Sequence, residues 1–108
     1  MARSLGAQGR CTGADISAPL IELARRKAVE TGADNTEFLV ADAQQHAFQP
    51  AAFDAVISRF GVMFFGDPIA AFANLRRSAR RGAALDLIAW RSAEDNPFMT
   101  AAERAALA

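Results

Sequence analysis

Strand signals and helix signals alternate along the chain, and this alternation restricts the fold more than any other sequence feature. Apolar, strand-favouring runs cover residues 10–15, 36–41, 53–58 and 84–90. Amphipathic, helix-favouring segments cover residues 17–32, 67–82 and 96–108. Such alternation predicts right-handed crossovers onto a parallel sheet. We therefore expect one α/β domain over residues 1–108, with a mostly parallel sheet of about four strands flanked by helices.

Two of the predicted helices carry the same start and stop signals. Ser17 and Asp67 are capping side chains, and each is followed by a proline in the first helical turn. Gly32 and Gly82 are expected to end these helices. The apolar faces that we predict consist of Leu20, Leu23, Ala24 and Ala28 in the first helix and of Ile69, Phe72, Ala73 and Leu75 in the second.

Charge and composition indicate which classes of binding partner suit this chain. Twelve basic and twelve acidic residues cancel, which disfavours nucleic acid and anionic membrane surfaces as partners. Arginines cluster at 76–81, where cations suit the negative end of the second predicted helix. Cys11 is the only cysteine, so no disulfide can form within the chain. No apolar run approaches the roughly 20 residues of a membrane span. We expect a cytoplasmic protein that binds a small molecule.

Two aspartates follow the first two predicted strands, at the sheet edge where ligands bind in open α/β folds. A carboxylate at Asp15 can accept hydrogen bonds from both hydroxyls of a ribose, although it can equally cap the helix that follows. Asp42 has the same position after the next strand, where it can read the exocyclic amine of an adenine. Ile16 is placed to lie against the face of that base. Together these residues indicate a nucleotide-like ligand.

An apolar segment follows the third predicted strand, with the sequence Ser-Arg-Phe-Gly-Val-Met-Phe-Phe over residues 58–65. An aromatic wall here suits a thioether or sulfonium, because aromatic faces attract sulfur and cations, although core packing explains such residues equally well. Ser58 has no glycine-flanked nucleophile elbow around it, and His46, the only histidine, is expected at the surface. We therefore predict neither a catalytic triad nor a metal site.

These motifs resemble those of the class I S-adenosylmethionine-dependent methyltransferases, in a branch that acts on small molecules. The matching pieces occur in the family's order, at residues 13–17, 40–43, 53–65 and 85–90. The resemblance implies that S-adenosylmethionine is the cofactor and that a methyl group is transferred to a small-molecule acceptor, with no catalytic acid or base required. The cofactor-binding residues that it implies are Asp15 for ribose, Asp42, Ile16 and Ala43 for adenine, and Ser58 and Phe60 for the methionine end.

The resemblance also has departures. Members of the family usually have a strand and a glycine-rich loop about 20 residues before the ribose-binding acid, and Asp15 leaves no room for them. We therefore expect an N-terminally truncated, partial Rossmann-like fold without the central first strand, in which residues 2–9 form the tail of a helix. The strands over 10–15 and 53–58 would then face a gap. At 81–83, Arg-Gly-Ala replaces a Pro-Gly-Gly turn.

Three functions follow from these observations. The first is an S-adenosylmethionine-dependent methyltransferase; the second is a non-catalytic, methyltransferase-like remnant or interaction module. The third is a nicotinamide-dependent oxidoreductase, which Asp42 and the segment 58–65 disfavour. Because the glycine-rich loop is missing, we predict that this chain alone binds S-adenosylmethionine weakly or not at all. Open sheet edges would also favour self-association.

Overall fold

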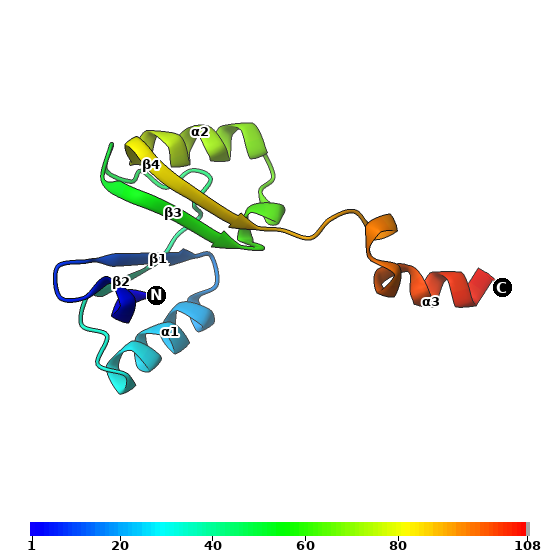
Figure 1. Ribbon diagram of the computed structural model, residues 1–108, viewed down its shortest axis with the longest axis horizontal. Coiled ribbons are helices and arrows are strands. Elements are labelled where there is room, and N and C mark those ends of the chain that lie inside the picture. Colours follow the sequence, from blue (N-terminus) through cyan, green and yellow to red (C-terminus); the bar gives the residue numbers. More distant parts are fainter. Residues whose placement is uncertain (108) are drawn as a thin grey trace.

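The computed structural model describes residues 1–107 and has the alternating order of strands and helices that the sequence predicts (Figure 1). Its strands are β1 (Cys11–Asp15), β2 (Thr36–Val40), β3 (Phe53–Arg59) and β4 (Ala79–Ile88). Its α-helices are α1 (Ala18–Glu30), α2 (Pro68–Ser78) and α3 (Pro97–Leu107), and its short 3-10 helices are η1 (Ala2–Leu5), η2 (Gly61–Phe64) and η3 (Ala93–Asp95). The predicted α/β class with parallel strands is confirmed.

The four strands form two separate pairs. β1 pairs with β2 in parallel, and β3 pairs with β4 in parallel. β1 and β3 run in the same direction side by side, but no strand within residues 1–107 lies between them (Figure 1). The facing edges of β1 and β3 therefore leave their ladder hydrogen bonds unmade, and one sheet of four strands is not formed.

The first half of the fold consists of β1, α1 and β2. Its strand register is unbroken, from Cys11 opposite Thr36 to Asp15 opposite Val40. At the start of α1, the Ser17 hydroxyl accepts a hydrogen bond from the Leu20 N–H, as its capping role predicts. The helix packs on both strands of its pair.

The predicted apolar face of α1 is wrong in part. Ile21 is the helix residue that is buried, at 3% exposure, and Ala24 and Ala28 are half-buried beside it. Leu20 and Leu23, which we expected on the buried face, are 55% and 40% exposed. A pair of strands is too narrow to cover a wide apolar stripe, so the leucines at its margin stay in solvent.

The second half consists of β3, α2 and β4, and it departs from expectation at the end of α2. The helix begins as predicted, with Asp67 accepting a hydrogen bond from the Ala70 N–H, but it ends at Ser78 instead of at Gly82. β4 starts immediately and bulges: Ala79 and Ala84 lie opposite residues that are only two apart on β3. Gly82 has a φ of 82°, so it serves this bulge and not a helix end.

The buried face of α2 is polar as well as apolar. Ala71, Asn74 and Ser78 are its buried residues. Ile69, which we placed on the apolar face, is 85% exposed. β3 is exposed at Asp54, Ala55, Ile57 and Arg59. A single helix, α2, packs on this strand pair, so it covers only one face of the pair and keeps its own outer side in solvent.

The termini add little to the core. Residues 2–9 form the single turn η1 and a loop in place of the expected helix tail, and the Asn35 amide holds them through the carbonyl oxygens of Ala2, Gly6 and Gly9. α3 projects away from both strand pairs (Figure 1). The radius of gyration is accordingly 17.0 Å, against about 13 Å for a compact domain of this length. No helix among residues 1–107 is long and apolar enough to cross a membrane.

Candidate functional site

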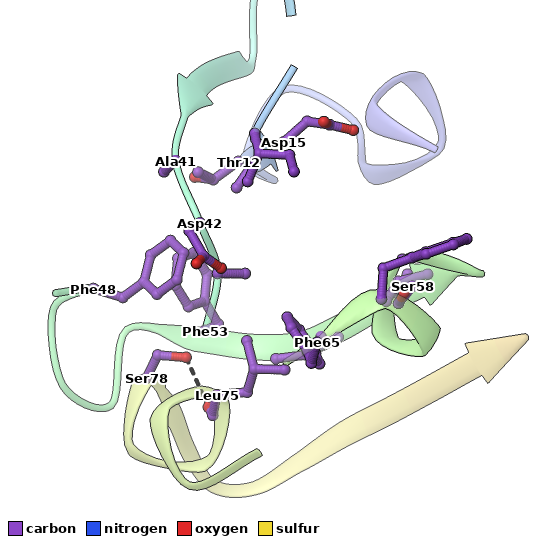
Figure 2. A pocket seen from close by; sticks show the side chains of 18 residues that line it. Thr12, Asp15, Ala41, Asp42, Phe48, Phe53, Ser58, Phe65, Leu75 and Ser78 are labelled. Carbon is purple, nitrogen blue, oxygen red and sulfur yellow. Dashed lines mark hydrogen bonds between the residues drawn. The ribbon is translucent and has the colours of Figure 1, made fainter. Parts of the chain in front are cut away.

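A cleft of about 430 Å³ lies between the two strand pairs; it runs along β1 and β3, from Thr12 and Phe53 to the carboxyl ends of both strands (Figure 2). Ligand sites typically have volumes of about 300–1,000 Å³ and mostly apolar walls. In Figure 2, Asp15 and Asp42 reach the cleft from the side of β1 and β2, and Phe53, Ser58 and Phe65 reach it from the side of β3. Each half of the fold therefore supplies one wall.

Asp15 is held by the chain that follows it. Its Oδ1 atom accepts a hydrogen bond from the Ser17 N–H at 2.8 Å, and its main-chain oxygen accepts one from the Ala41 N–H at 2.9 Å. Its Oδ2 atom has no hydrogen-bond partner in the described part of the chain. The side chain is thus oriented by one oxygen and offers the other to a ligand. Ile16 is next to it on the cleft and is 74% exposed.

Asp42 is oriented in a similar way by the loop after β2. Its Oδ1 atom accepts a hydrogen bond from the Gln44 N–H at 2.9 Å. Its Oδ2 atom accepts a longer one, at 3.3 Å, from the exposed amide of Gln45. The first contact fixes the carboxylate, whereas a solvent-exposed contact of this length is weak and easily replaced by a ligand donor. Ala43 lines the cleft beside Asp42.

Ser58 and Phe60 lie at the end of β3 but serve different purposes. The Ser58 hydroxyl accepts a hydrogen bond from the Val62 N–H at 3.2 Å, which holds the turn of η2 beside the cleft. Phe60 has a left-handed backbone, with a φ of 68°, and its ring stacks on Trp90 with 5.3 Å between centroids. It is absent from the lining of the cleft.

The structure therefore brings together five of the six residues that the sequence singled out. Asp15, Ile16, Asp42, Ala43 and Ser58 line the cleft, and Phe60 does not. Aromatic side chains at this end of the cleft come instead from residues 64 and 65, whose core packing and ligand contact the sequence left open.

Two further residues support the site and were missed in the sequence. Asn74 on α2 donates to the carbonyl oxygens of Ala43 and His46, and Gln44 accepts from the Asp67 N–H. The only sequence signal for Asn74 is an amide within an otherwise apolar helix segment. Its partners could not be identified, because they lie about 30 residues earlier in the chain.

The single histidine is not a fully exposed residue. His46 is half-buried, and its ring contacts that of Phe48 edge-on, with 4.6 Å between centroids. Over residues 1–107, no group of three or more His, Cys, Asp or Glu side chains could hold a metal ion. Two carboxylates, those of Asp15 and Asp42, lie among the mostly apolar residues that line the cleft.

The chain is similar in sequence to known methyltransferases. The family profile described as "Methyltransferase domain" matches residues 1–86. The chain is 38% identical over 72 residues to aklanonic acid methyltransferase DauC of Streptomyces sp. strain C5, a match that covers 67% of this chain and 33% of that protein. It is 31% identical over 101 residues to the ubiquinone/menaquinone biosynthesis C-methyltransferase UbiE of Hahella chejuensis, which covers 93% of this chain and 40% of that protein.

A similar fold occurs among solved structures. The crystal structure of a SAM-dependent methyltransferase from Aquifex aeolicus superposes with a TM-score of 0.78 at 21% identity, over 83% of this chain and 48% of that one. The chain thus spans less than half the length of these relatives. On the family match over residues 1–86, the chain belongs to the methyltransferase-domain family.

Proposed function

We propose that this chain forms the adenosine-binding part of an S-adenosylmethionine-dependent methyltransferase that acts on a small molecule. The observation that carries the proposal is the position of Asp15 and Asp42, which lie on one cleft at the carboxyl ends of two paired parallel strands. Membership of the methyltransferase-domain family supports the reaction class. We take residues 1–108 as one functional unit, because both strand pairs contribute walls to this cleft.

The ribose of the cofactor is assigned to Asp15. Ser17 already orients this carboxylate through Oδ1, so binding a ribose at Oδ2 requires no rearrangement of the side chain. Hydrogen bonds to a charged carboxylate are about twice as strong as those between neutral groups. We expect Asp15 to be the largest single polar contribution to binding.

The adenine is assigned to the loop after β2. The exocyclic amine would replace the Gln45 amide on Asp42, while the contact from the Gln44 N–H keeps the carboxylate in place. Ile16 and Ala43 supply apolar contacts next to this carboxylate. Adenosine offers an amine donor, two hydroxyl donors and an apolar base face. These match the two carboxylates and the apolar side chains on this side of the cleft.

The methionine end is assigned to the far side of the cleft, near Ser58. There the cofactor, when bound, supplies an electrophilic methyl group on a sulfonium, and aromatic faces attract such a cation. Phe64 and Phe65 line this region, whereas Phe60 stacks on Trp90 and does not line the cleft. Because methyl transfer depends mainly on holding donor and acceptor in line, the role of these residues is to position the donor.

The acceptor is proposed to be a small molecule, as the names of DauC and UbiE indicate for those relatives. The balanced net charge does not favour nucleic acid as a partner, and the lone Cys11 is consistent with a reducing cytoplasm. We further propose that the facing edges of β1 and β3 promote self-association, since unpaired strand edges readily pair with another chain. Size-exclusion chromatography over a range of protein concentrations tests this: a monomer at all concentrations would refute it.

Titration followed by amide NMR tests the cofactor site. We expect S-adenosylmethionine to shift the signals at the ends of β1 and β2 only at millimolar concentration, because no ladder hydrogen bonds join the two walls of the cleft. Asp15→Asn and Asp42→Asn should each weaken this binding about tenfold, which is the usual loss for a hydrogen bond to a charged group. Asp34→Asn is the matched control, because Asp34 is exposed and lies outside the cleft.

The other outcomes of this titration are equally informative. Equal losses in all three variants would contradict the assignment of the two aspartates. No shifts at millimolar cofactor would favour the non-catalytic interaction module. A stronger response to NADH than to S-adenosylmethionine would favour the oxidoreductase.

A further inference from the structure

Asn74 is a polar side chain that is buried in a helix facing the cleft. It is 8% exposed, and its Nδ2 atom donates to the main-chain oxygens of Ala43 and His46, both at 2.9 Å. Its Oδ1 atom accepts a hydrogen bond from the Arg77 guanidinium at 2.7 Å. Both amide hydrogens are therefore used, and Arg77 fixes which side of the amide faces the loop.

The same loop is fastened to α2 at a second point. The Gln44 Oε1 atom accepts a hydrogen bond from the main-chain N–H of Asp67, the residue that caps α2. The main-chain N–H of Gln44 in turn orients Asp42. The segment 42–46 thus extends along α2, with one attachment at the start of the helix and another near its end.

This attachment crosses between the two halves of the fold. The loop continues from β2, whereas α2 packs with β4. Because β1 and β3 belong to different sheets, the position of Asp42 relative to the opposite wall of the cleft is not set by ladder hydrogen bonds. The contacts of Asn74 are buried, and they join the loop to α2 next to Asp42, so they can set this position.

We propose that Asn74 is a positioning residue that holds the base-reading loop 42–46 in register with the opposite wall, and so sets selectivity for adenine. The inference rests on the proposed function, since it takes the cofactor's base to lie at Asp42. A side chain that contributes only stability would leave base selectivity unchanged. A positioning residue changes the preference between two bases as well as the affinity.

The first test needs no ligand. Amide hydrogen exchange is measured in Asn74→Ala and in Asn74→Asp, which keeps the shape of the side chain but cannot donate to the two carbonyl oxygens. We expect exchange at residues 43–46 to accelerate about tenfold or more, with β2 unaffected. Asn35→Ala is the matched control, because the Asn35 amide also bridges carbonyl oxygens, at Ala2, Gly6 and Gly9, but far from the cleft.

The second test measures base selectivity. S-adenosylhomocysteine and its inosine counterpart, in which oxygen replaces the exocyclic amine, are titrated in parallel by NMR. The unmodified chain and Asn35→Ala should prefer the adenine ligand about tenfold, because a carboxylate accepts from an amine and repels a carbonyl oxygen. In both Asn74 variants we expect this ratio to fall toward one.

The outcomes separate this inference from the proposed function. If the unmodified chain shows no preference for the adenine ligand, the proposed adenine site is wrong, whatever the exchange data show. If the unmodified chain prefers adenine and the Asn74 variants keep the same ratio, Asn74 is not a positioning residue. Unchanged exchange at residues 43–46 would overturn the inference independently of any ligand.

Discussion

The two halves of the molecule have the same plan, a parallel pair of strands with one helix, but they hold their helices by different means. In the first half, α1 buries the apolar side chain of Ile21 against an unbroken strand pair. In the second half, α2 buries Asn74 and Ser78 together with Ala71, and its strand pair is bulged. Apolar burial gives stability without direction, whereas buried hydrogen bonds fix position. In the second half the hydrogen bonds that reach the proposed base-reading loop come from a buried residue, whereas in the first half the hydrogen bond between helix and strand, from Arg25 to the Phe38 carbonyl oxygen, is exposed.

The largest expected effect on the stability of the first half comes from substituting Ile21. Ile21→Ala removes the buried side chain of the first half and should cost about 2–5 kcal/mol in free energy of unfolding. Urea unfolding followed by circular dichroism measures this loss. Leu23→Ala, on the same helix but 40% exposed, is the control and should cost much less. Similar losses in both variants would mean that α1 is not held by Ile21.

The two helix caps show whether the halves behave as one unit. Ser17→Ala and Asp67→Ala each remove a side-chain cap, at a typical cost of about 1 kcal/mol. Because the halves share no ladder hydrogen bonds, we expect each substitution to speed amide exchange mainly in its own half. Equal acceleration of α1 and α2 by either substitution would show a single cooperative unit instead.

The smallest expected effect concerns the bulge of β4. Asp54 and Arg80 form an ion pair across it, with 2.6 Å between Oδ1 and Nε, but their side chains are 72% and 61% exposed. Asp54→Asn should therefore lower the free energy of unfolding by less than about 1 kcal/mol, and high salt should remove the difference. Glu22→Gln, which breaks the exposed pair with Arg25 in the first half, is the matched substitution. A loss well above that of Glu22→Gln would show that the bulge depends on its ion pair.

Much of the fold could be predicted from local sequence signals. The caps at Ser17 and Asp67 and the alternation of strands and helices are local, and they locate every main element. The boundary between α2 and β4 was misplaced, because β4 begins at Ala79 and not at Ala84. Burial was predicted less well, since periodicity assigned Leu20 and Leu23 to the core in place of Ile21. The periodicity indicates an apolar stripe, but only the width of the sheet decides how much of it is covered.

Some residues of the candidate site could be predicted from the sequence, and others could not. Asp15 and Asp42 were found because the end of a parallel strand is recognisable in sequence, and parallel strand ends share one edge. Phe60 was expected on the cleft, but its backbone has a positive φ and its ring stacks on Trp90. A positive φ is uncommon for a phenylalanine, so the sequence does not predict it. Asn74 depends on contacts 28 and 31 residues away in the chain, which a single sequence does not reveal.

The stack of Phe60 on Trp90 has a consequence for the intrinsic fluorescence of the protein. Trp90 is the only tryptophan and the chain has no tyrosine, so ultraviolet emission excited at long wavelength comes from one indole, just beyond the end of β4. That indole lies parallel to a phenyl ring, with 6° between their planes. Trp90 also contacts the ring of Phe98 in α3, with 5.5 Å between centroids, so its emission reports on the end of β4 and on the C-terminal segment. The first half has no emitting side chain. A fluorescence melting curve thus follows only the surroundings of Trp90, whereas a circular dichroism melting curve of the same sample follows the helices and strands of both halves.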